Sequence, residues 1–215
     1  MMKKVLILSC STGQGHNSCA GAIREYFALN EVDCDIVDAF AFISDRFAAF
    51  MSWGHSFMYR HVPLLFRKGY QYSEERTDAF REGSAAGWLL NRGTDDLRRY
   101  IEEGGYDTVI CAHSLAAIML TFMQNEAALS VRTAFVATDH TCYPGMGVCD
   151  LDHYFVADSS QVEVYKQCGV PGERIVVSGI PVRRLFFDHC DKKEARSHLG
   201  LREEGRLCPR EKQCL

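Results

Sequence analysis

A histidine near the start of the chain is the first residue whose type and position could do chemistry. An apolar run ends in Ser9-Cys10-Ser11-Thr12-Gly13-Gln14-Gly15-His16-Asn17. Gly13 and Gly15 allow a tight turn and a close approach of the backbone to a ligand. Histidine exchanges protons near neutral pH, so His16 could accept a proton from a substrate. The segment therefore predicts a ligand site that contains a general base.

A second polar segment is Thr138-Asp139-His140-Thr141-Cys142-Tyr143-Pro144-Gly145-Met146-Gly147. Asp139 could orient or polarise a histidine and raise its basicity. In the alternative interpretation Asp139 caps a turn, and Pro144-Gly145 simply forms one. The residues alone leave both interpretations open.

The elements that position these segments alternate between strands and helices. Strands are predicted over residues 3–9, 33–37, 107–111, 131–137, 153–157 and 174–178, and helical patterns cover 17–29, 114–125 and 159–167. This βα alternation predicts an α/β fold with a doubly wound, mainly parallel, Rossmann-like sheet. Ligands of such sheets bind at the carboxyl edge, where His16 and Asp139 are expected to meet.

A long insertion over residues 39–100 departs from the alternation and is rich in aromatic residues. Its helical stripe consists of Ile43, Phe47, Phe50, Met51, Phe57, Met58, Val62 and Leu65. The stripe can pack against the sheet or lie on a membrane surface, since basic amphipathic helices with Trp and Tyr favour the headgroup region. The predicted lipid contacts are Phe50, Trp53, Phe57, Arg60, Arg67 and Lys68. Pro63 should kink or end the first helix.

Composition limits the class of protein. The 215 residues are 47% hydrophobic with a net charge of −4, which suits one α/β domain and argues against a nucleic-acid-binding protein. The sequence shows neither a signal-peptide pattern nor an apolar run long enough to span a bilayer. We therefore expect a cytosolic protein, or one attached to a membrane from the cytosolic side.

Ten cysteines are scattered along the chain without any C-x-x-C pair. Cys10 and Cys111 end predicted strands, whereas Cys19 and Cys168 fall in predicted helices. The pattern indicates reduced, packed thiols rather than a disulfide scaffold, and it lacks the ligand spacing of a structural metal site.

Two enzyme classes compete on partial motifs. Gly13-x-Gly15 as a phosphate turn, with Asp38 after the second strand as the ribose partner, resembles the fingerprint of a dinucleotide-binding oxidoreductase, but its third glycine falls on Ser18. The segment 112–116, Ala-His-Ser-Leu-Ala, has the strand-to-helix position of a hydrolase nucleophile elbow, with alanines in place of both glycines. Asp139 or Asp150 and then His153 would complete the serine hydrolase order. The simpler interpretation is that Ser114 caps a helix.

A third interpretation comes from resemblance. The segments 11–17, 138–141 (Thr-Asp-His-Thr), 154–156 (Tyr-Phe-Val) and 178–182 (Ser-Gly-Ile-Pro-Val) occur in this order. They resemble the N-terminal half of the monogalactosyldiacylglycerol synthase and processive diacylglycerol glucosyltransferase family. More distantly, the chain is similar to the N-terminal half of the peptidoglycan lipid-intermediate N-acetylglucosaminyltransferase. The likeness extends to about Leu201, and Gln14 departs from it where relatives often have a third glycine.

The resemblance implies the N-terminal half of a GT-B glycosyltransferase that moves a hexose from a UDP-sugar to diacylglycerol with inversion. His16 takes the position of the general base, assisted by Asp139. Gly13, Gln14, Gly15 and Asn17 would lie where the donor phosphates approach. The acceptor cleft would contain Thr138, His140, Thr141, Tyr143, Pro144, Gly179 and Pro181. The resemblance implies no metal and no cofactor beyond the UDP-sugar co-substrate.

The domain expectation follows from the same resemblance. Residues 1–200 would form the acceptor and lipid-binding domain, and 201–215 a truncated or atypical tail without the donor domain. The isolated chain is then expected to be inactive, and to work on the inner face of the cell membrane as a cytoplasmic, peripheral protein. Its partners would be diacylglycerol, an anionic membrane surface and the UDP-sugar, and no nucleic acid. The alternative is a non-catalytic module that binds lipid or membranes.

Overall fold

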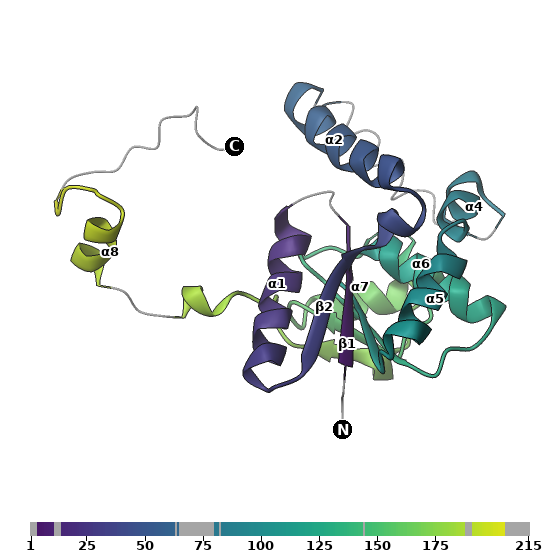
Figure 1. The fold of residues 1–215 in the computed structure, drawn as a ribbon. Coiled ribbons are helices and arrows are strands. Elements are labelled where there is room, and N and C mark those ends of the chain that lie inside the picture. Colours follow the sequence, from purple (N-terminus) through teal and green to yellow (C-terminus); the bar gives the residue numbers. More distant parts are fainter. Residues whose placement is uncertain are drawn as a thin grey trace. The chain divides into compact units, whose positions relative to one another are not determined.

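The computed structural model describes residues 4–10, 14–62, 64, 80–81, 83–143, 145–187 and 191–204. The chain divides into two units, Met1–Arg183 and Arg184–Leu215. The first contains every strand of the sheet (Figure 1). In the second, the described residues form one turn of 3-10 helix, η4 (Arg184–Phe186), and the short helix α8 (Lys192–His198).

The first unit is built on a six-stranded sheet in the order β2-β1-β3-β4-β5-β6, and every neighbouring pair is parallel. The strands are β1 (Lys4–Ser9), β2 (Asp33–Asp38), β3 (Thr108–Cys111), β4 (Arg132–Val136), β5 (His153–Val156) and β6 (Ile175–Val177). The predicted α/β class and Rossmann-like parallel sheet are confirmed. Each predicted strand is present with ends that differ by one residue at most.

Helices pack on both faces of the sheet because its central strands are apolar and buried on both sides. In β1, Leu6 and Leu8 join one core cluster, whereas Val5 and Ile7 join the other. α1 (Gln14–Leu29) packs on the second cluster through Cys19 and Ala20. The helices on the opposite face are α5 (Thr94–Gly104), α6 (Ser114–Glu126) and α7 (Gln161–Gln167) (Figure 1).

The strand order reverses direction between β1 and β3. From β1 the chain crosses outward to β2, and the next strand, β3, pairs with the other side of β1. Such a reversal leaves a crevice at the carboxyl ends of the two strands, where ligands of open α/β sheets bind. α1 begins at Gln14, so the predicted helix start at residue 17 is wrong by three residues. His16 consequently lies in the first helical turn rather than in the preceding loop.

In the part of the predicted insertion that the structure describes, the chain forms separate elements. They are η1 (Ala39–Phe42), α2 (Asp45–His61) and α4 (Ala85–Asn91), followed by the crossover helix α5. Ser44 caps α2 by accepting a hydrogen bond from the Phe47 amide at 3.0 Å. α2 ends at His61, two residues before Pro63, which itself lies outside the described residues. Leu65, Arg67 and Lys68 also lie outside them.

The aromatic stripe of α2 divides between two environments. Phe47, Ala48 and Met51 pack against the core. Phe50 and Trp53, in contrast, are 63% and 61% exposed, and the Trp53 and Phe57 rings stack with centroids 5.0 Å apart. Packing against the sheet therefore accounts for the start of the stripe only. No helix among the described residues has the length and apolar character needed to cross a bilayer.

The remaining short elements follow the later strands. η2 (Met146–Val148) lies between β4 and β5, and η3 (Gly172–Arg174) leads into β6. Gly147 packs so closely on the end of α7 that a Cβ atom there would lie 2.2 Å from the Cys168 carbonyl oxygen. This contact holds the long segment after β4 against the end of α7.

A candidate active site at the carboxyl edge of the sheet

His16 is held by groups that follow two other strands. Its Nδ1 lies 2.8 Å from the Ala112 carbonyl oxygen, after β3, and 3.0 Å from the Thr138 hydroxyl, after β4. A carbonyl oxygen can only accept, so Nδ1 carries the hydrogen and donates it. The lone pair of the neutral imidazole is then on Nε2. This tautomer is the one that a general base acting through Nε2 requires.

The first turn of α1 is anchored to the end of β1. The Ser9 hydroxyl donates to Asn17 Oδ1 at 2.7 Å, so Asn17 helps to fix the turn that carries His16. A Cβ atom added at Gly15 would have no neighbour within 4 Å. Packing within the described residues therefore does not require glycine at this position, which faces open space. Gln14 is exposed beside it, and Gly13 lies outside the described residues.

The predicted Asp139 segment approaches His16 through two hydroxyl groups. The Thr138 hydroxyl lies 2.8 Å from the Tyr143 hydroxyl. Burial raises the pKa of Tyr143, and the nearby Asp139 carboxylate adds to that rise. Asp139 Oδ1 also accepts from the Thr141 hydroxyl at 3.0 Å, as the turn-capping interpretation predicted. One path from Asp139 to His16 thus runs through Tyr143 and Thr138.

His113 is a site residue that the sequence reasoning missed as a neighbour of His16. The two rings lie with centroids 4.5 Å apart. His113 is also the N-cap of α6, because its Nδ1 accepts from the Leu115 amide at 3.1 Å. The prediction that Ser114 caps this helix is therefore wrong by one residue, and Ser114 is the buried first residue of α6. The signal available in the sequence was a histidine directly after a predicted strand.

The serine hydrolase interpretation fails on the sheet geometry. His153 is the first residue of β5, so it lies at the amino edge, whereas Ser114 follows the carboxyl end of β3. Asp150 precedes β5 and pairs with Arg174. A triad needs its three side chains within hydrogen-bond reach of one another. His153 and Asp150 lie on the wrong side of the sheet for Ser114.

A cavity of about 660 Å³ adjoins this site at Tyr143. Its lining combines apolar and polar groups and consists of Arg81, His140, Thr141, Cys142, Tyr143, Gly145, Met146, Gly147, Val148, Val164, Gln167, Cys168 and Gly169. The hydroxyl of Tyr143 belongs to the His16 network, and the same side chain lines the cavity. A ligand in the cavity would therefore contact Tyr143, whose hydroxyl group is linked to His16 through the Thr138 hydroxyl group.

Other predicted cleft residues lie farther along the same edge. His140 Nδ1 is 2.9 Å from Asp158 Oδ2, which links the segments after β4 and β5. Gly179, with φ of +84°, and Pro181 follow β6. Pro144 lies outside the described residues.

The described residues hold no group of three or more His, Cys, Asp or Glu side chains arranged to bind a metal ion. The seven cysteines among them are free thiols. Burial raises the pKa of Cys19 to about 12, and it raises the pKa values of Cys10 and Cys111 as well. Protonated thiols of this kind are poor nucleophiles and metal ligands.

Comparison with known proteins first identifies the fold class. The chain is similar to the apo form of the lipopolysaccharide outer core galactosyltransferase WaaB, with a TM-score of 0.51 and 10% sequence identity. The match covers 81% of this chain and 44% of that protein. The fold is thus the Rossmann-like α/β fold found in GT-B glycosyltransferases.

The family follows from the sequence comparison. The family model for monogalactosyldiacylglycerol (MGDG) synthase matches residues 16–182, and the chain belongs to this family. It is 27% identical over 190 residues to the processive diacylglycerol beta-glucosyltransferase of Bacillus cereus strain B4264, and 26% identical to that of Bacillus mycoides. Each match covers 85% of this chain and 46% of the relative. The chain spans about half the length of these relatives, and the resemblance seen in the sequence is confirmed.

Proposed function

We propose that this chain is the acceptor-binding half of a glycosyltransferase that moves a hexose from a UDP-sugar to diacylglycerol. The observation that carries the proposal is the position of His16. Its tautomer is fixed by the Ala112 carbonyl group at the carboxyl edge of the sheet, within the stretch that the family model matches. The names of the Bacillus relatives supply the acceptor class.

His16 would act as the general base. As the acceptor hydroxyl attacks the anomeric carbon, its proton passes to Nε2, the new C–O bond forms, and the bond to UDP breaks with inversion. The imidazolium then keeps its Nδ1 hydrogen bond to the Ala112 carbonyl group. A positioned base of this kind typically contributes ~10²–10⁴-fold to the rate. Asp139 would raise the basicity of His16 indirectly, through the hydroxyl groups of Tyr143 and Thr138.

The two substrates would approach from different sides of His16. Gln14, Gly15 and Asn17, together with Gly13, would lie where the donor phosphates approach, and the second half of the enzyme would hold most of the UDP-sugar. The acceptor would enter past Thr138 and Tyr143 toward the cavity of about 660 Å³. His140, Thr141, Pro144, Gly179 and Pro181 would border that side. The proposal requires no metal ion.

The exposed face of α2 supports a peripheral attachment to the membrane from the cytoplasmic side. Phe50, Trp53 and Phe57 are exposed on α2, and Arg60 is exposed near its end. Aromatic and basic side chains on one helix favour the headgroup region of an anionic bilayer. Arg67 and Lys68 would extend this contact. The same face also favours the second candidate function, a lipid-binding module without catalysis.

The test combines this chain with the second half of the Bacillus cereus relative, in trans or as a fusion, and measures glycosyl-diacylglycerol formation. We expect His16→Ala to lower the rate at least a hundredfold. The matched control is His153→Ala, which removes an exposed imidazole at the opposite edge of the sheet and should leave the rate unchanged. Undiminished transfer by His16→Ala would reject the base assignment.

A direct binding measurement separates the two candidate functions. Dioctanoylglycerol added to the chain alone should shift the NMR resonances of the His16 and Tyr143 rings if the acceptor binds beside the base. Membrane binding without any such shift, together with no transfer by the combined halves, would favour the non-catalytic module.

A further inference from the structure

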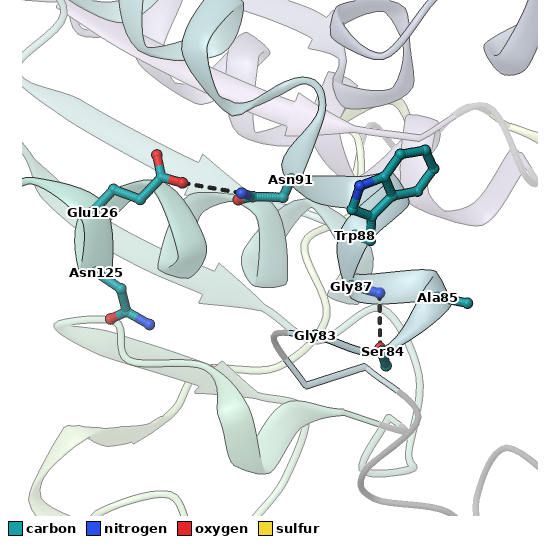
Figure 2. A pocket seen from close by; sticks show the side chains of 8 residues that line it. All are labelled: Gly83, Ser84, Ala85, Gly87, Trp88, Asn91, Asn125 and Glu126. Carbon is teal, nitrogen blue, oxygen red and sulfur yellow. Dashed lines mark hydrogen bonds between the residues drawn. The ribbon is translucent and has the colours of Figure 1, made fainter.

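A second cavity, of about 590 Å³, lies apart from the His16 site. Its walls come from α4, from the residues before α4 and from the C-terminal end of α6 (Figure 2). They are formed by Gly83, Ser84, Ala85, Gly87, Trp88, Asn91, Asn125 and Glu126. α6 begins at the carboxyl edge beside His16, and its 13 residues carry Asn125 and Glu126 roughly 18 Å away from that edge.

The cavity pairs an exposed aromatic surface with fixed polar groups. The Trp88 side chain is 62% exposed, and the Arg92 guanidinium lies 5.3 Å from its ring centroid. Asn91 is one helical turn after Trp88, and its Nδ2 donates to Glu126 Oε1 at 3.0 Å (Figure 2). This bond fixes an amide and a carboxylate in the wall of the same cavity that Trp88 lines. The core contains Leu90 from the same helix but leaves Trp88 outside.

A hexose has the complementary chemistry. The C–H groups of a pyranose form an apolar face that can stack on an indole, while its hydroxyl groups donate to a carboxylate and accept from an amide. Glu126 retains a second carboxylate oxygen, and Asn91 has both a donor and an acceptor. The volume falls within the range of about 300–1,000 Å³ that small-molecule sites occupy. The Glu126 carboxylate in the wall and the Arg92 guanidinium over the indole supply both signs of charge, which suits a neutral polar ligand better than an acyl chain.

We propose that the Trp88 cavity is a binding site for a hexose, either as a free sugar or as the headgroup of a glycolipid. The site is separate from the His16 centre and does not depend on the transferase proposal. A sugar of this size on an open site should bind with a dissociation constant of about 1 mM. A glycolipid held there would keep the protein at a surface that already carries glycosylated lipid.

Tryptophan fluorescence provides the first test, because the chain contains two tryptophans, Trp53 and Trp88. In the full-length chain carrying Trp53→Phe, all tryptophan fluorescence comes from Trp88. Methyl β-D-glucopyranoside and methyl β-D-galactopyranoside should change its emission in a saturable way, whereas glycerol should not. An emission that stays unchanged or changes only linearly with both glycosides would overturn the proposal.

Variants of the polar wall test the assignment of the contacts. In the Trp53→Phe background, Asn91→Ala and Glu126→Ala should each weaken the glycoside about tenfold. The matched control Glu103→Ala removes an exposed carboxylate on α5 and should not change the affinity. Circular dichroism establishes that each variant is folded. If both wall variants bind as tightly as the control, the ligand does not occupy this cavity and the proposal fails.

Vesicles distinguish a free sugar from the headgroup of a glycolipid, and both of these from a simple membrane contact. Phosphatidylcholine vesicles with and without glucosyl-diacylglycerol are added to the Trp53→Phe chain. A change in Trp88 emission only with the glycolipid, reversed by free methyl glucoside, supports the headgroup. A response to the free glycoside alone supports the free sugar. Equal responses to both vesicles, insensitive to free glycoside, would make Trp88 a membrane contact and overturn the hexose site.

Discussion

His16 and His113 are adjacent imidazoles that the backbone holds in opposite tautomers. His16 donates from Nδ1 to the Ala112 carbonyl group, whereas His113 accepts at Nδ1 from the Leu115 amide. Protonating His113 at Nδ1 would break the cap of α6, so the helix favours its neutral form. In the proposed mechanism the proton taken from the acceptor would stay on His16, because a proton on His113 Nδ1 would cost the α6 cap.

Replacing His113 separates its capping role from its ring contact with His16. His113→Ala should lower the free energy of unfolding by about 0.5–2 kcal/mol, because the Leu115 amide loses its acceptor. His113→Asn supplies a carbonyl oxygen at the cap and should restore most of that stability. Both variants lose the imidazole ring whose centroid lies 4.5 Å from that of His16. The rate of transfer by the combined halves should therefore be below the wild-type rate in both variants. Urea unfolding and the transfer assay check this, and wild-type transfer by His113→Asn would contradict it.

Several residues of this site could be predicted because they follow apolar strands of a parallel sheet. His16 and Thr138 follow β1 and β4, and they meet at the edge where the βα alternation placed them. Contacts that depend on side-chain direction could not be predicted. The contact of His16 with the Ala112 carbonyl group and with His113 arises from the strand order, which brings β3 next to β1.

At the scale of elements, α2 packs against the core through one face of its first turns, and its opposite face is exposed. Its first turns pack through Phe47 and Met51, whereas Phe50 and Trp53 project away from the core. Helical periodicity alone could not distinguish the two environments, because it records only which residues share a face. The packing of α2 against the core depends on residues that lie far away in the sequence.

Vesicle binding tests the exposed face of α2. The triple variant Phe50→Ser, Trp53→Ser, Phe57→Ser should weaken binding to anionic vesicles at least a hundredfold, since a buried aromatic contributes about 1.5–3 kcal/mol. Tyr26→Ser is the matched control, because Tyr26 is 65% exposed on α1. Sedimentation with vesicles measures the effect, and circular dichroism establishes folding. Binding equal to that of the control variant would reject the membrane role of α2.

The turn before α7 gives a pH-dependent prediction. Hydrogen bonds from the Ser160 side chain and amide, and then from His140, lower the pKa of Asp158. A carboxyl group whose pKa is lower in the folded state stabilises the fold above its unfolded pKa of ~3.9, and this stabilisation is lost as the pH falls through the folded value. Asp158→Asn should therefore unfold at lower urea than wild type at pH 7. The difference should disappear in strong acid, and a constant difference at both pH values would contradict the assignment.

At the scale of the whole molecule, the structural and family boundaries coincide. The first unit ends at Arg183, and the family match ends at residue 182. Both core clusters lie in this unit, and Ile175 is their last member. The strand pattern predicted this sheet because six apolar runs are separated by helical lengths. The Trp88 cavity could not be predicted from the sequence. Its walls come from α4 and from the end of α6, which lie apart in the sequence and form a cavity only because the two helices pack together.

Truncation tests whether the first unit folds independently. A chain that ends after Arg183 keeps both core clusters and the ion pair between Arg183 and Glu25 on α1, so its urea midpoint should equal that of the full chain. A chain that ends after Val170 loses β6 and the packing of Ile175, and it should be destabilised by about 2 kcal/mol or more. Urea unfolding followed by circular dichroism compares the three chains. A lower midpoint for the chain ending at Arg183 would show that residues 184–215 contribute to the stability of the sheet domain.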